Sequence, residues 1–174
     1  MTDLLRRTSA VFSPCRTWRV RLDRVWDDRL PPFSAGLLNP STADEERNDP
    51  TVDRVERRAF RLGFGSLILW NAFAFRATDP DVMMAAADPV GPGNDEAIEA
   101  ILVEVRERRG TVLVGWGVGG YHNDRDLAVL AIADRVGVPL FCLGTTAAGQ
   151  PRHPLYIRND EPLRPWPRPA RAGG

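Results

Sequence analysis

Four short apolar runs, separated by segments with helical periodicity, most constrain what this chain can fold into. The apolar runs are residues 33–38, 67–70, 112–114 and 138–143. The segments with apolar residues at helical spacing are 52–62, 97–105 and 127–136, and a glycine follows each of them. Parallel strands are joined by connections of this length, usually helices. The pattern therefore predicts an α/β fold: a three-layer sandwich with a central, mainly parallel four-stranded sheet.

The N-terminal part has a different period. Over residues 15–26, Trp18, Val20 and Leu22 alternate with polar residues, as in a strand with one buried face. We therefore expect an N-terminal antiparallel strand or hairpin beside the sheet. The predicted organisation is a lead-in with little periodicity (1–14), a single α/β domain (15–161), and a tail rich in Pro, Arg and Gly (162–174) that is extended or disordered.

Composition narrows the classes of function. The 174 residues suffice for a hydrophobic core, and 23 Arg (no Lys) balance 23 Asp and Glu. Zero net charge excludes a histone-like nucleic-acid binder, which needs a large positive excess. Cys15 and Cys142 are too few for a disulfide framework or a thiolate cluster, and we expect no metal or cofactor. With no membrane-length apolar run and no signal-peptide core, we expect a cytoplasmic protein without an obligate protein partner.

Unusual residues fall directly after the predicted strands. Ligands of open parallel sheets bind beyond the carboxyl ends of the strands. Asn39 follows the first apolar run, Asn71 ends the second, a glycine-rich loop with Gly117 follows the third, and His153 follows the fourth. We expect these segments to meet at one edge of the sheet and to form a site there.

Each of these residues also has a structural alternative. An Asn before Pro, such as Asn39, commonly starts a turn, and a His before Pro is commonly a surface residue. Asn71 must either bond to the protein or face a ligand, because a buried amide needs partners. The sequence GVGG is a weak sign of a phosphate loop and also simply allows a tight turn. Only the common location favours a functional site.

The same four places resemble the motifs of the uracil-DNA glycosylase superfamily. The matching segments are LLNPST at 37–42, LILWNAFAFRA at 67–77, VLVGWG at 112–117 and RHPLY at 152–156. Separately, the whole pattern NPSTAD…NAFAFRATDP…HPLY resembles a bacterial family known only as a domain of unknown function. The first resemblance implies a uracil-DNA glycosylase-like fold and an N-glycosidase that flips out a modified or mismatched base and cleaves its bond to the sugar.

The superfamily resemblance also implies roles for individual residues. Asn39 would hold the water through its amide oxygen, Asn71 would read the base edge, and His153 would donate to the negative charge on the departing base. Candidates for an aromatic or apolar wall around the base are Trp70, Phe73, Phe75 and Tyr156. Leu155 or Tyr156 would enter the duplex as a wedge, and Pro40, Ser41 and Gly117 would line the substrate site. Arg152 and Arg158 would lie near phosphates.

Departures from the superfamily pattern leave three hypotheses open. Position 39 is Asn where the most active branch has Asp, Leu155 replaces a Ser, and the insert STADEERNDPT after Asn39 is acidic and fits DNA poorly. The first hypothesis is an N-glycosidase acting on a modified or mismatched base in DNA. The second is a non-catalytic binding protein for a nucleobase, nucleotide or modified nucleic acid, and the third is a hydrolase of a free nucleoside or nucleotide. The expected partner is DNA or a nucleotide-like ligand.

Overall fold

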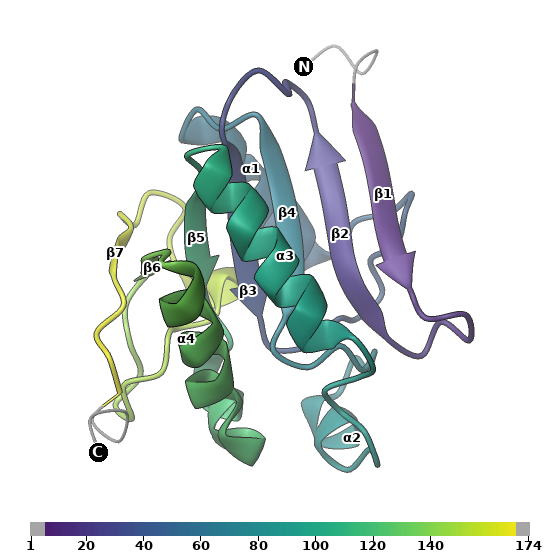
Figure 1. Ribbon diagram of the computed structural model, residues 1–174. Coiled ribbons are helices and arrows are strands. Elements are labelled where there is room, and N and C mark those ends of the chain that lie inside the picture. Colours follow the sequence, from purple (N-terminus) through teal and green to yellow (C-terminus); the bar gives the residue numbers. More distant parts are fainter. Residues whose placement is uncertain (1–5, 170–174) are drawn as a thin grey trace.

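Seven strands form one sheet in the computed structural model, which describes residues 6–169 (Figure 1). The strands are β1 (Arg7–Phe12), β2 (Arg19–Val25), β3 (Pro32–Leu37), β4 (Ser66–Asn71), β5 (Thr111–Val114), β6 (Leu140–Cys142) and β7 (Arg164–Pro165). Their order across the sheet is β1-β2-β4-β3-β5-β6-β7. The four central strands, β4-β3-β5-β6, run parallel and correspond to the four predicted apolar runs.

Three antiparallel strands extend the sheet beyond the four that were predicted. The hairpin of β1 and β2 adds to the edge of β4, which confirms the expected N-terminal antiparallel element, and β7 adds to β6. β1 lies where we expected a lead-in with little periodicity. It is mostly exposed on both faces, so its sequence carries no alternation. β7 lies in the expected tail, where the buried Trp166 holds the chain against the core. The division into lead-in, domain and tail stays a prediction.

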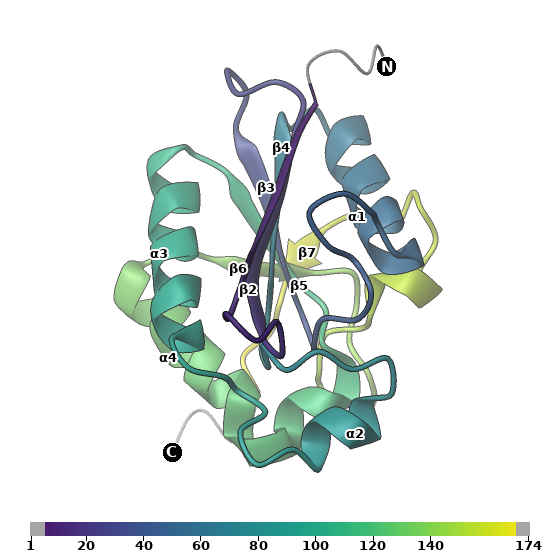
Figure 2. The ribbon, with the colours of Figure 1, turned by 90° about the vertical axis from the view of Figure 1, so that its right-hand side faces the viewer.

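Helices cover both faces of the sheet. Figure 2 shows α1 (Pro50–Arg61) on one face and both α3 (Asn94–Glu107) and α4 (Arg125–Val136) on the other, which gives the expected three layers. The shorter elements are α2 (Pro80–Met84) and two 3-10 helices, η2 (Gly117–Asp124) and η3 (Pro154–Tyr156). In Figure 1, α2 lies below the sheet, where the parallel strands end.

The core is divided between the two faces by the alternation of each strand. On β4, Leu67 and Leu69 pack on the α1 side, whereas Ile68 and Trp70 pack on the side of α3 and α4. Burying a side chain of this size contributes about 1.5–3 kcal/mol. The alternation therefore decides which layer each side chain of β4 enters.

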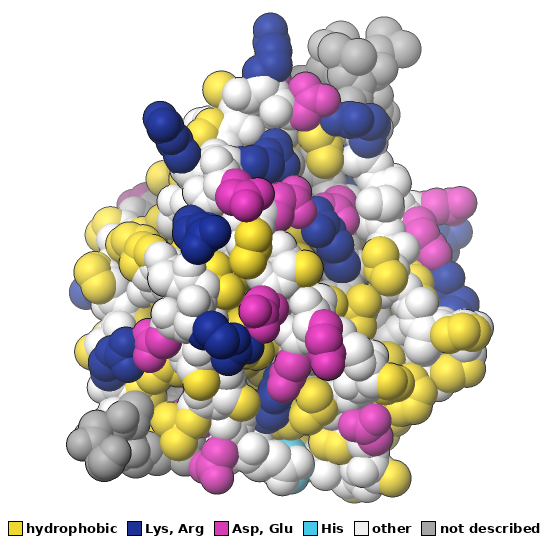
Figure 3. Space-filling view, in the orientation of Figure 1, with side chains coloured by type: hydrophobic (Ala, Val, Ile, Leu, Met, Phe, Trp, Pro, Cys, Tyr) yellow, Lys and Arg dark blue, Asp and Glu magenta, His cyan; other side chains and the backbone are white. Residues whose placement is uncertain are grey.

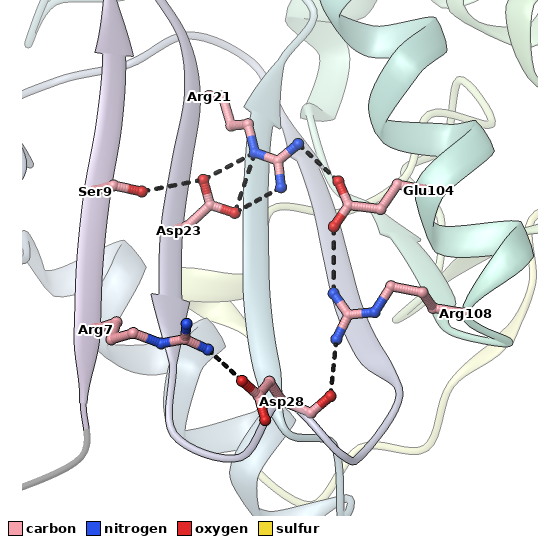
Figure 4. Close-up of polar contacts among 7 residues, drawn as sticks. All are labelled: Arg7, Ser9, Arg21, Asp23, Asp28, Glu104 and Arg108. Atoms are coloured by element: carbon pink, nitrogen blue, oxygen red, sulfur yellow. Dashed lines mark hydrogen bonds and ion pairs between the residues drawn. The ribbon is translucent and has the colours of Figure 1, made fainter.

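A network of charges ties the N-terminal hairpin to α3 (Figure 4). Arg21 on β2 donates to Asp23 and, at 2.8 Å, to Glu104 on α3, and Arg108 donates to the same Glu104 at 3.2 Å. Figure 3 shows acidic and basic side chains interspersed on this face of the molecule. The charged side chains on this face link β2 to α3, and they do not form a patch of a single charge sign.

Candidate functional site

A pocket lies where the connections of the sheet diverge. From β3 the chain passes through α1 to β4, whereas from β5 it passes through η2 and α4 to β6, on the opposite face. The segments that follow β3 and β5 therefore separate and leave a crevice between the strand ends, the usual ligand position in open α/β sheets. The pocket in this crevice has a volume of about 1000 Å³, which is ample for a small-molecule ligand.

The three candidate polar residues line this one pocket, although they come from distant parts of the chain. Asn39 follows β3, Asn71 ends β4, and His153 directly precedes η3. The other expected site residues that line the pocket are Pro40, Ser41, Gly117, Leu155 and Tyr156. Folding thus brings together the segments that the sequence placed at one sheet edge.

Asn39 is half-buried and has a fixed amide group. Its Nδ2 donates to the backbone carbonyls of Pro40 at 3.1 Å and Ala77 at 2.8 Å. These two bonds fix the orientation of the amide. Its Oδ1 accepts no hydrogen bond from the described residues and is left for a ligand or a water molecule. The turn role and the functional role of Asn39 are therefore compatible.

Asn71 is only 1% exposed, and of its side-chain amide only the oxygen makes a hydrogen bond to the described residues. Its Oδ1 accepts from Nη2 of Arg19 at 3.3 Å, and its backbone carbonyl accepts from Nδ2 of Asn94 at 3.1 Å. Its own Nδ2 donates to none of the described residues. Because a buried amide nitrogen needs an acceptor, this donor is the atom of Asn71 that suits a ligand.

His153 is held as a neutral donor. It caps η3, and its Nδ1 accepts the backbone N–H of Leu155 at 3.3 Å. This bond assigns the ring proton to Nε2. Burial lowers the pKa of His153 below its ordinary value of 6.5 and outweighs the nearby charge of Asp49, which acts to raise it. At neutral pH the ring is therefore uncharged, with Nε2–H as its only donor.

Three of the four aromatic residues expected as walls of the site do not line the pocket, and the structure corrects this expectation. Trp70 and Phe73 are both 0% exposed and belong to the core on the side of α3 and α4. The Trp70 ring fills the space beside Gly36, where a Cβ would lie 2.3 Å from it, and its Nε1 donates to Ser34. Phe75, the third candidate, packs edge-on against Trp18 and is also outside the pocket. The aromatic side chains that line it are Trp116, Tyr121 and Tyr156.

The two arginines expected near phosphates lie beside a separate hollow. Arg152 and Arg158 line a smaller depression of about 290 Å³, and Tyr156 is common to both hollows. Arg158 is exposed and pairs with Asp160 at 2.8 Å. Neither arginine lines the main pocket, so their expected role toward phosphates stays a prediction.

The pocket-lining residues that sequence reasoning missed include Arg19, Asp49 and His122. Arg19 is 2% exposed, and burial lowers its pKa to about 10. It makes no ion pair within the part of the chain that the structure describes. Asp49 caps α1, and the Asp-Pro pair at 49–50 is a helix-start signal that a search for caps would have found. Nothing in the local sequence indicates that Arg19 is buried.

Fold and site together define a three-layer α/β protein with a mainly apolar pocket, which also holds amide, imidazole and carboxylate groups, at the carboxyl ends of its parallel strands. The chain belongs to the family described as protein of unknown function (DUF1643), whose family model matches residues 19–155. This confirms the expected membership in a domain family of unknown function. No curated protein and no solved structure matches the chain, and the resemblance to the uracil-DNA glycosylase superfamily stays a prediction.

Two absences hold for residues 6–169, the part of the chain that the structure describes. Within this range no helix is long and apolar enough to cross a membrane. The same range holds no group of three or more His, Cys, Asp or Glu side chains placed to hold a metal ion.

Proposed function

We propose that this protein is an N-glycosidase that hydrolyses the bond between a nucleobase and its sugar. One observation carries the proposal: Asn39, Asn71 and His153 line a single pocket. Each is fixed by a hydrogen bond to the protein, and each keeps one atom without a described partner: Oδ1 of Asn39, Nδ2 of Asn71 and Nε2–H of His153. This set contains the three groups that the reaction needs.

The proposed roles follow from how charge develops in the reaction. As the base–sugar bond breaks, its electron pair moves onto the base, and positive charge develops on the sugar. The Nε2–H of His153 donates to the base as it becomes negative, and removing one such donor typically costs about a hundredfold or more in rate. Nδ2 of Asn71 donates to a carbonyl oxygen on the base edge. Oδ1 of Asn39 accepts a hydrogen bond from the water that adds to the sugar carbon.

The walls of the pocket suit a planar base. Trp116, Tyr121 and Tyr156 contribute aromatic surface, and Tyr156 is 79% exposed at the rim. Bases bind to such surfaces by stacking, with about 1–3 kcal/mol per base. The neutral state of His153 also suits a reaction at neutral pH, because the donor hydrogen on Nε2 is present without protonation of the ring.

A second candidate, hydrolysis of a free nucleoside or nucleotide, is favoured by the electrostatics of the rim. The acidic insert after Asn39 forms one wall of the pocket, with Thr42 and Asp49 among the lining residues. Arg152 and Arg158, which would contact phosphates of a duplex, lie outside the pocket. Together with zero net charge, this arrangement disfavours tight binding of duplex DNA and favours a small substrate.

A base-release assay tests the proposal and separates the candidates. The purified chain is incubated with nucleosides, 5′-mononucleotides and single- and double-stranded oligonucleotides that carry uracil, hypoxanthine or 8-oxoguanine, and free base is measured by chromatography. We expect release by the wild-type chain and loss of release in Asn39→Ala and His153→Ala. The exposed Asn159, outside the pocket, provides the matched control Asn159→Ala, which should keep wild-type activity.

The pattern of release then distinguishes the hypotheses. Release from oligonucleotides supports the first candidate, and release from monomers alone supports the second. Binding of these ligands in calorimetry without any release would contradict hydrolysis and leave a binding protein. Full activity in His153→Ala would remove this residue from the mechanism.

A further inference from the structure

The loop between β3 and α1 delivers a carboxylate to the pocket. This segment, residues 38–49, folds back against β2, and its last residue, Asp49, lines the pocket together with Asn39 and His153. The pocket therefore contains a carboxylate in addition to its amide and imidazole groups.

Two buried arginines of β2 hold this loop in place. Nη1 of Arg19 donates to the carbonyl of Ala43 at 2.8 Å. Nη2 of Arg24 donates to the carbonyl of Asp44 at 2.7 Å, and its Nε donates to Oδ1 of Asn48 at 2.8 Å. Both arginines are at most 2% exposed. Bonds from buried charged donors are among the stronger hydrogen bonds, so the position of Asp49 is set by the sheet.

The geometry of Asp49 leaves one oxygen available. Oδ1 accepts the backbone N–H of Val52 at 2.9 Å and caps α1, whereas Oδ2 accepts no hydrogen bond from the described residues. Burial lowers the pKa values of His153 and Arg19, and the charge of Asp49 opposes this shift in both groups. Asp49 therefore lies within electrostatic reach of the proposed donor, His153, and of Arg19.

We propose that Asp49 is the catalytic carboxylate that receives the proton of the attacking water, an inference that rests on the N-glycosidase function proposed above. The bond between C1′ and the base nitrogen breaks, and its electron pair goes to the base, which His153 stabilises through Nε2–H. The water oxygen bonds to C1′, and one water proton moves to Oδ2 of Asp49. This proton then passes through solvent to the base anion, so that the products are the neutral base and the free sugar hydroxyl.

Asp49→Asn is the decisive variant because it separates the charge from the cap. Asn caps helices as well as Asp does, so α1 should form normally. Since a general base acts only as the bond breaks, kcat for base release should fall about a hundredfold or more while KM stays close to the wild-type value. The matched control is Asp79→Asn at the N-cap of α2, which bonds to Asp81 N at 2.9 Å and does not line the pocket. It should keep full activity.

A second variant distinguishes a catalytic carboxylate from a structural one. Asp49→Ser keeps a capping hydroxyl and leaves space in the pocket, so added formate should restore a large part of the lost base release. Wild-type kcat in Asp49→Asn, or failure of formate to restore Asp49→Ser, would overturn the assignment of Asp49 while the N-glycosidase function stands. An inactive wild-type chain would instead overturn the N-glycosidase function, and the assignment with it.

Discussion

The substitution Asn71→Asp should leave the fold intact and change which base is accepted. Oδ1 of Asn71 already accepts a hydrogen bond from the buried Arg19, which makes no ion pair among residues 6–169. A carboxylate at position 71 still accepts the hydrogen bond from Arg19, and its negative charge gives this arginine an ion-pair partner. A hydrogen bond to a charged group contributes about 1.5–3 kcal/mol, and this gain offsets the cost of burying the new charge.

The same substitution at a neighbouring buried Asn should have the opposite effect. Nδ2 of Asn94, which is 0% exposed, donates to the carbonyls of Asn71 at 3.1 Å and Ala72 at 3.3 Å. Asp cannot donate these bonds and places negative charge beside both oxygens. The carbonyl of Ala72 keeps a hydrogen bond from Nε of Arg125 at 2.9 Å, so the carbonyl of Asn71 is the group that loses its donor. Its loss should cost about 1–3 kcal/mol, and burial of the new unpaired charge adds several kcal/mol.

Urea and thermal unfolding followed by circular dichroism measure this contrast. In a chain of this length, 1 kcal/mol shifts the melting temperature by about 2–4 °C. We expect Asn71→Asp to stay within about 4 °C of the wild type and Asn94→Asp to melt well below it. Base release by Asn71→Asp should decline for bases that present a carbonyl oxygen, because the Nδ2 donor is gone. An unfolded Asn71→Asp would show that Asn71 is a structural residue and would refute its assignment as base reader.

Three further predictions concern stability and reactivity. His153→Ala should lower the melting temperature by only about 1–4 °C, because it removes one short helix cap. Since the pKa of His153 is lowered by folding, wild-type stability should fall as pH drops below 6.5, where the unfolded chain binds the proton, and the variant should lack this part of the pH dependence in unfolding experiments. Glu104→Gln should cost about 1 kcal/mol at pH 7 in urea unfolding. Burial alone would raise the pKa of Glu104, but hydrogen bonds from Arg21 and Arg108 lower it, so the difference should vanish as pH falls through that lowered pKa. A difference that stays constant as pH falls through the acid range would contradict the network in Figure 4. Cys15 should react with an alkylating reagent at pH 7.5 well before the buried Cys142, because hydrogen bonds, led by that of Ser13, lower the pKa of Cys15 to about 7. Equal reaction rates of the two thiols would refute this prediction.

The central strands and the long helices were predictable because their buried faces require apolar residues at regular positions in the sequence. β4 is buried on both faces and therefore reads as a continuous apolar run, and α1 shows the helical stripe that packs on it. β1 was not predictable, since an exposed edge strand needs no buried face. α2, η2 and η3 were also missed, because elements of one or two turns carry too few residues for periodicity to appear.

The site was predictable in its location and only partly in its composition. The rule for parallel sheets placed Asn39, Asn71 and His153 at one edge, and they line one pocket. The error over Trp70 was avoidable, because consecutive residues of a strand point to opposite faces and Asn71 was already assigned to the pocket. Arg19 and Asp49 depend on how a loop folds back over the sheet, and such long-range contacts leave little trace in a single sequence.

A crystal structure of the protein soaked with free nucleobases, uracil and hypoxanthine, tests the central claim most directly. We expect a base in the pocket beyond β3 and β5, with a carbonyl oxygen of the base on Nδ2 of Asn71 and another acceptor atom of the base on Nε2 of His153. A base that binds elsewhere on the molecule, or a pocket that stays free of base at saturating concentration, would contradict it.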